Sequence, residues 1–153
     1  MTRDSRLSIV LHGLLHMKAH GKPMTSAELA VCMDTNPVVV RRTMAGLRDR
    51  GLVNSEKGHG GGWTSARPLE EISLLDIHEC LGEPDVIGFA NKEESPGCLI
   101  EQAVNRELDA TMEEMRAVFA ARMRQITLAD IWASVRERFA AHHNYRKDQQ
   151  HDA

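Results

Sequence analysis

The chain has 153 residues, a net charge of −3 and an aromatic content of only 4%. This length suits one domain with its own core, or a small head that carries a long helical extension, and it is short for two full domains. No charged segment followed by an apolar stretch opens the chain, and no apolar run is long enough to cross a bilayer. The pattern therefore predicts a soluble protein with no membrane partner. The three cysteines are odd in number and widely spaced, which argues against a disulfide framework and favours a reducing cytoplasm.

Charge is distributed unevenly along the chain. Residues 1–67 hold ten Lys and Arg against five Asp and Glu, which gives +5, whereas residues 68–153 hold nine against seventeen, which gives −8. A basic head on an acidic body indicates that the head meets phosphate and the body meets protein. Few aromatic side chains are available to stack on single-stranded bases, so double-stranded DNA is the expected nucleic-acid partner.

The basic part of the chain begins with predicted helices. A helix is expected over residues 5–20, and a capping box at residues 25–28 opens a second helix over about residues 26–34. Asn36 is a favoured N-cap residue, followed by a proline in the first helical position, so a third helix is expected to run up to Gly51. The result is a helix, a short turn and a second helix.

The third of these helices has an apolar stripe and a cationic outer face. Val40, Met44 and Leu47 share the stripe and are expected to face the core. The outward residues at the start of the helix then include Arg41 and Arg42, which we expect to contact guanine or phosphate, as recognition helices do. The alternative is that the two arginines form an ordinary solvated surface.

A glycine-rich hairpin follows the third helix. Residues 52–56 and 63–66 alternate like the two arms of a hairpin, and the glycines between them suit a tight turn. A helix-turn-helix followed by such a hairpin is a winged helix-turn-helix, which reads duplex DNA. A nucleotide-phosphate loop is disfavoured because the sequence lacks the P-loop pattern. The residues predicted to contact DNA are Ser26, Asn36, Val38, Val39, Arg41, Arg42, Arg48, Lys57, His59, Gly60 and Gly61.

A long helix is expected in the second half of the chain. Residues 98–124 contain neither glycine nor proline, and apolar side chains recur at spacings of three and four. The head is too small to cover this stripe, so a second copy of the helix is the natural partner and a two-fold homodimer is expected. Packing within one chain is the alternative. The predicted dimer interface consists of Ile100, Val104, Leu108, Met112, Met115 and Phe119.

The predicted fold class is mainly α with a small β-hairpin wing, a winged helix-turn-helix head and a long dimerisation helix. The head is expected over residues 1–82 and ends in a short helix opened by a second capping box. Residues 83–97 form a loop, residues 98–145 hold the dimerisation helix and a C-terminal helix that ends at about His142, and residues 146–153 form a flexible tail.

Five segments resemble those of a known family: residues 26–30 (SAELA), 36–42 (NPVVVRR), 47–53 (LRDRGLV), 60–63 (GGGW) and 72–77 (ISLLDI). Together they resemble the Rrf-type winged helix-turn-helix regulators, the family of IscR, NsrR and BadM. The resemblance extends over nearly the whole chain and is strongest over residues 6–82. It implies a homodimeric bacterial transcription regulator with residues 37–50 as the recognition helix and the helix after residue 98 as the dimer element.

The chain departs from that family in its cysteines. Cluster-binding members carry three closely spaced cysteines in the loop before the dimer helix, because an iron–sulfur cluster needs several convergent thiolates. Cys98 is the only cysteine in that region here, since Cys80 lies on the preceding helix and Cys32 lies in the head. We therefore expect no cofactor.

Metal binding and enzymatic chemistry are not expected either. The three histidines His12, His16 and His20 fall on one face of the first helix, and a solvated polar face is the simpler reading of that spacing. No catalytic motif is present, so the sequence predicts that the chain is not an enzyme.

The cysteines suggest an input signal. Cys98 sits at a helix start, where the positive end of the helix dipole favours a thiolate, and Cys32 of a second copy is the candidate resolving thiol. Cys80 is expected to act as a small buried hydrophobe. We therefore expect a dimeric DNA-binding regulator, a repressor of a palindromic operator with a thiol-based redox switch. The alternatives are a winged-helix adaptor that scaffolds an enzyme and a regulator controlled by a small-molecule ligand.

Overall fold

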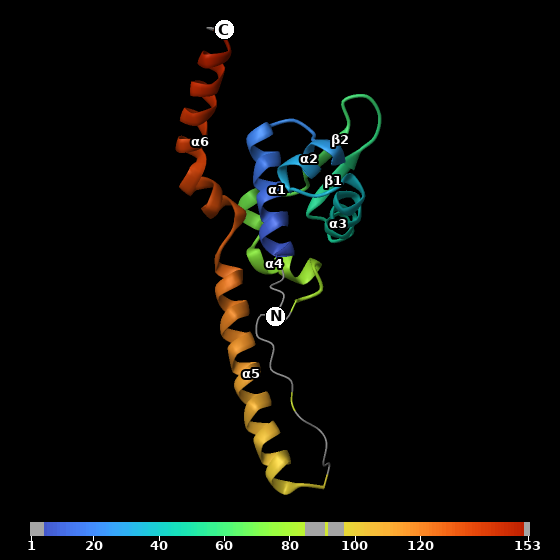
Figure 1. The fold of residues 1–153 in the computed structure, drawn as a ribbon, viewed down its shortest axis with the longest axis vertical. Coiled ribbons are helices and arrows are strands. Elements are labelled where there is room, and N and C mark those ends of the chain that lie inside the picture. Colours follow the sequence, from blue (N-terminus) through green and yellow to red (C-terminus); the bar gives the residue numbers. More distant parts are fainter. Residues whose placement is uncertain (1–4, 85–90, 92–96, 152–153) are drawn as a thin grey trace.

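The computed structural model describes residues 5–84, residue 91 and residues 97–151, with side-chain surroundings up to residue 141. Helices α1–α4 and a hairpin form a head, α5 runs from its distant start up to the head, and α6 continues past the head along one side of it (Figure 1). The elements are α1 (Arg6–His20), α2 (Ser26–Cys32), α3 (Pro37–Asp49), β1 (Val53–Glu56), β2 (Gly62–Ser65), the 3-10 helix η1 (Leu69–Glu71), α4 (Leu74–Cys80), α5 (Leu99–Gln125) and α6 (Leu128–His151).

The predicted caps are present in the head. Thr25 and Glu28 exchange the reciprocal hydrogen bonds of a capping box at the start of α2. The Oδ1 atom of Asn36 accepts hydrogen bonds from the first two free amides of α3, both at 3.0 Å. Gly51 ends α3 with a φ of +68°, a left-handed conformation that glycine adopts without steric cost. Helix α2 stops at Cys32, two residues before the expected end.

The wing is a two-stranded antiparallel hairpin tied to the head. Its register pairs Val53 with Ser65 and Glu56 with Gly62. Backbone hydrogen bonds in both directions also link Trp63 to Met24, which precedes α2. The predicted fold class, mainly helical with a small hairpin wing, is confirmed.

The head core includes the beginning of the last helix. Leu29, Val40, Leu47 and Ile77 are fully buried, and so is Leu128, the first residue of α6. Backbone hydrogen bonds fix this junction, from the Leu74 amide to the Ile126 carbonyl and from the Leu128 amide to the Ile72 carbonyl, both at 2.9 Å. The domain limit at residue 82 stays a prediction. Residues after the long helix, among them Leu128, nevertheless contribute to the core of the head.

The apolar stripe of α5 has two different environments. Ile100, Val104 and Leu108 are 77%, 52% and 40% exposed, whereas Phe119 is half-buried and Met123 is buried. Among the described residues, the stripe therefore meets the head at its C-terminal end. Helix α6 continues to His151, beyond the expected end near His142, and no glycine or proline interrupts it. Among the described residues, no helix is both long and apolar enough to span a membrane.

Candidate DNA-binding surface

Helix α3 presents a cationic and apolar outer face at its N-terminal half. Val38 and Val39 are 65% and 46% exposed, and Arg41 and Arg42 are exposed beside them. The stripe that contains Val40 is buried in the head, which orients this face outward. Among the described side chains, no acidic group pairs with either arginine, so both guanidinium groups are available for phosphate or base edges.

The wing tip carries four further predicted contact residues. Lys57, His59 and Gly60 are exposed, and Gly61 is half-buried. The turn is closed by a hydrogen bond from the Gly61 amide to the Gly58 carbonyl at 3.1 Å. A Cβ atom at Gly61 would lie 2.4 Å from the carbonyl oxygen of Glu56, so only glycine fits this tight return of the chain.

Three of the predicted contact residues have structural roles in the described chain. The indole Nε1 of Trp63 donates a hydrogen bond to the Ser26 hydroxyl at 3.0 Å, which ties α2 to the wing. The amide oxygen of Asn36 caps α3, and Arg48 forms an ion pair with its neighbour Asp49 at 3.3 Å. Ser26 and Asn36 therefore position the surface as well as lying beside it.

Two arginines that the sequence analysis did not single out hold the C-terminal end of α3. Arg67, which follows the wing, donates a hydrogen bond from Nη2 to the Arg50 carbonyl at 3.2 Å. The Arg50 guanidinium lies 3.9 Å from the Glu79 carboxylate on α4. These partners are far apart in sequence, and no local pattern connects them.

The three cysteines lie on separate elements, and all are half-buried free thiols. Cys98 is the N-cap residue of α5, and Cys32 is the last residue of α2. Burial raises the pKa of the Cys80 thiol, and the opposing effect of Arg50 is smaller. Within one chain, α2 lies in the head, and the start of α5 lies at the end of that helix that is distant from the head (Figure 1).

These residues do not fit an iron–sulfur cluster. Such a cluster requires several thiolates that converge on one point. Cys80 is at the end of α4 and Cys98 begins α5, and the part of the chain that the structure describes contains no group of three His, Cys, Asp or Glu side chains able to hold a metal ion.

The histidine face of α1 differs from the expected solvated surface. The Nε2 atoms of His12 and His16 lie 2.9 Å apart, and the His16 ring also contacts Phe139 of α6 at a centroid distance of 6.2 Å. Burial lowers the pKa of His16, and the neighbouring His12 lowers it further. Packing of α6 against α1 therefore half-buries His16, although the spacing of the three histidines suggested that this face is fully exposed.

Comparison with known proteins gives consistent matches. A family model named Rrf2, described as an iron-dependent transcriptional regulator, matches residues 3–134. The chain is 25% identical over 128 residues to the HTH-type transcriptional regulator YwnA of Bacillus subtilis, which covers 84% of this chain and 95% of that protein.

Solved structures share the fold. A transcriptional regulator from Lactobacillus plantarum is similar with a TM-score of 0.71 and 21% identity, covering 97% of this chain and 99% of the other. IscR of T. potens is similar with a TM-score of 0.65 and 19% identity, covering 88% of each chain. The family consists of transcriptional regulators, so the expectation that the chain is not an enzyme is confirmed. The family match extends over most of the chain, and the protein therefore belongs to the Rrf2 family of transcriptional regulators.

Proposed function

We propose that this regulator binds a palindromic DNA operator as a homodimer and represses transcription in the cytoplasm. The observation that carries the proposal is the outer face of α3, where Arg41 and Arg42 are exposed without an acidic partner among the described side chains. The exposed valines beside them suit thymine methyl groups. A protein-binding adaptor would have no need for unpaired cations at this position.

Binding of the purified protein to its own upstream region, followed by footprinting, tests the DNA contact. Affinity should fall on the order of a thousandfold between 50 and 200 mM salt if a dimer neutralises about six or more phosphates. Arg42→Ala should cost roughly 1–3 kcal/mol on the operator if the side chain reads a base, and a uniform loss on all sequences would make it a phosphate contact. Arg138→Ala removes the same charge from α6 and should leave affinity unchanged. A flat salt profile would favour the adaptor.

The dimer is proposed from the exposed half of the α5 stripe. Leu99 and Ile100 are 78% and 77% exposed, and Val104 and Leu108 continue the same surface. A second copy of α5 would cover these side chains, and the two-fold axis would place two recognition helices about 34 Å apart, one turn of DNA.

A charge in this stripe should separate the copies. Leu108→Asp would bury an unpaired carboxylate in the apolar contact, so sedimentation should show monomers. Ala110→Asp, on the opposite side of the helix and exposed, is the matched control and should remain dimeric. A dimeric Leu108→Asp protein with normal operator binding would contradict this assembly.

We propose thiol oxidation as the input signal, with a disulfide between Cys98 of one copy and Cys32 of the other. The two thiols would lose two protons and two electrons, and hydrogen peroxide would take them up and become two water molecules. The positions of the two cysteines support a bond between chains rather than within one, because Cys98 caps the start of α5, which lies far from the head (Figure 1), whereas Cys32 ends α2 within the head. Such a bond would tie a head to the dimer axis and change the spacing of the recognition helices.

Peroxide should therefore produce a covalent dimer on non-reducing gels and alter operator affinity, and reductant should reverse both effects. Cys98→Ser should abolish both responses, whereas Cys80→Ser should keep them. If Cys98→Ser responds like the wild type, the disulfide is refuted and the signal is a ligand or a partner protein.

A further inference from the structure

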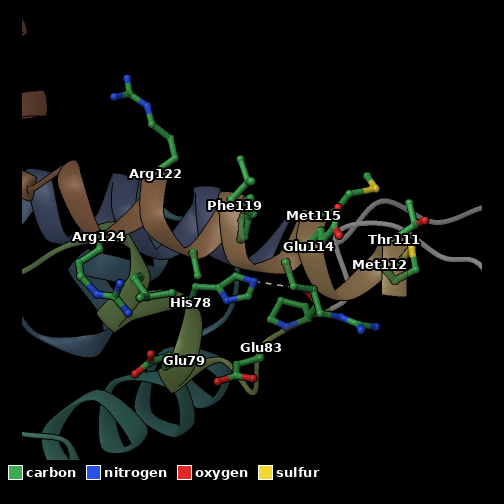
Figure 2. Close-up of a pocket in the computed structure, with 15 residues that line it drawn as sticks. His78, Glu79, Glu83, Thr111, Met112, Glu114, Met115, Phe119, Arg122 and Arg124 are labelled. Carbon is green, nitrogen blue, oxygen red and sulfur yellow. Dashed lines mark hydrogen bonds between the residues drawn. The ribbon is translucent and has the colours of Figure 1, made fainter. Parts of the chain in front are cut away.

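A cleft of about 800 Å³ lies where the C-terminal end of α1, strand β2, η1 and the start of α6 meet. Its volume is within the range of about 300–1,000 Å³ that small-molecule sites occupy. None of the residues that line it belongs to α3 or to the predicted DNA contacts. It is also separate from the groove between α4 and α5, which is lined by Met112, Met115 and Phe119 of the predicted dimer stripe and is therefore left to the second copy (Figure 2).

The apolar part of the cleft wall contains two tryptophans. Trp63 of β2 is buried, and Trp132 of α6 is half-buried against the core of the head. The indole N–H of Trp63 is already occupied by the Ser26 hydroxyl, so this side chain offers the cleft only apolar ring surface. Leucines of α1, η1 and α6 line the same wall. Such surroundings suit a flat aromatic ring.

Positively charged side chains from three parts of the chain also line the cleft. They are Lys18, Lys22, Arg67 and Arg136. All four are exposed, and among the described residues no ion pair engages the side chains of Lys18, Lys22 or Arg136. Their charges are therefore available to an anion that enters the cleft.

Two carboxylates in the cleft offset only part of this charge. Asp130 accepts hydrogen bonds from the Thr127 amide at 2.8 Å and the Thr127 hydroxyl at 2.9 Å in a capping box at the start of α6, and Glu70 is exposed on η1. Four cations against two carboxylates leave a net charge of +2. A concave surface with apolar walls and an excess of one sign attracts ions of the opposite sign.

We propose that this cleft binds a small aromatic anion, whose ring lies in the apolar part and whose carboxylate or phosphate group is held by Lys18, Lys22 and Arg136. The sugar-phosphate backbone of DNA is the competing occupant, because it is also anionic. A phosphate backbone has no ring to place against the two tryptophans, and the predicted DNA contacts lie outside the cleft. The combination of aromatic wall and unpaired cations therefore favours the small molecule.

Arg67 connects the cleft with the recognition helix. Its side chain lines the cleft, and its Nη2 donates a hydrogen bond to the carbonyl of Arg50, the residue that ends α3, at 3.2 Å. An anion attracts a guanidinium group more strongly than an uncharged carbonyl does, so a bound anion competes with Arg50 for this donor. Operator binding should then weaken, a consequence that rests on the proposed DNA-binding function.

Calorimetric titration of the full chain with benzoate and phenyl phosphate tests the site. At least one of the two should bind saturably at millimolar concentration, and the tighter one identifies the charged group. Benzyl alcohol keeps the ring without the charge, and acetate and inorganic phosphate keep the charge without the ring. Each of these three should bind at least about fivefold more weakly, because it loses either the ion pairs or the ring contacts.

Variants of α6 locate the site. Arg136→Gln removes one cation from the cleft and should weaken binding of the tighter aromatic anion about threefold, whereas Arg138→Gln, exposed on the same helix outside the cleft, should not. Ala133→Trp places a large side chain in the cleft and should abolish binding, and Ala140→Trp, exposed outside the cleft, should leave it intact. Both alanines are exposed, so both tryptophan variants should fold.

Several outcomes would overturn the proposal. These are no saturable binding of either aromatic anion, binding of benzyl alcohol or acetate as tight as that of benzoate and phenyl phosphate, and unaltered binding by Ala133→Trp. If neither anion binds and Arg136→Gln weakens binding to every DNA sequence, the cleft holds DNA phosphate instead.

The ligand site and the DNA-binding function can fail independently. A saturating aromatic anion should weaken operator binding by the wild type and leave Arg67→Gln unaffected. If the anion binds but the operator affinity of the wild type is unchanged, the connection through Arg67 is wrong. If the protein binds the anion but no DNA, the proposed function fails and the ligand site stands.

Discussion

Leu128→Ala should destabilise the head although residue 128 follows the long helix. Leu128 is 0% exposed and packs in the core with Leu29 and Ile77 of the head. The substitution removes the equivalent of about three methylene groups, worth roughly 2.4 kcal/mol of transfer free energy at about 0.8 kcal/mol each, and a cavity term adds to this. We therefore expect a loss of about 3 kcal/mol, a large part of the 5–15 kcal/mol that typically stabilises a domain.

Urea unfolding followed by tryptophan fluorescence provides the measurement, because Trp63 is buried in the same core and Trp132 packs against it. Each protein must be compared at one protomer concentration, since dimerisation shifts apparent stability. Val135→Ala on the same helix, where the side chain is 38% exposed, is the control and should cost less than about 1 kcal/mol. If Leu128→Ala costs no more than the control, the beginning of α6 is not part of the cooperative core of the head.

Three further predictions concern the candidate DNA-binding surface and the histidine face. Gly61→Ala should distort the wing and weaken operator binding, because the added Cβ would lie 2.4 Å from the Glu56 carbonyl oxygen; Gly46→Ala, with open space around it, should instead raise stability by about 0.5–1 kcal/mol in thermal unfolding. Asn36→Ala should cost about 1 kcal/mol in urea unfolding, since two amides of α3 lose their acceptor, and an unchanged midpoint would show that water replaces the cap. Burial lowers the pKa of His16 below 6.5 in the folded state, so the unfolded state binds more protons near this pH, and the free energy of unfolding should fall as the pH drops through about 6.5. The midpoint of urea unfolding, plotted against pH, should be flatter in this range for His16→Gln than for the wild type. An identical slope in the two proteins would refute the assignment to His16.

Local sequence rules were sufficient to predict the helix ends in the head and the exposed face of α3. A capping box, an N-cap residue and a C-terminal glycine involve groups within three or four residues of one another, so Thr25, Asn36 and Gly51 marked helix ends before any tertiary contact was known. The period of 3.6 residues placed Val40 inward and Arg41 and Arg42 outward in the same way.

What the sequence by itself determined was therefore the kind of protein and the location of the exposed cationic face of α3, because caps, turn glycines and helical periodicity act over a few residues. Only the tertiary structure decided which surfaces meet. The period of α5 shows that Ile100 and Phe119 share a face, but it does not show that Phe119 meets His78 while Ile100 stays exposed. The burial of Leu128 in the head likewise depends on where the chain lies after α5 ends at Gln125. Such contacts join segments tens of residues apart, and their energy comes from shape and burial that no local pattern encodes.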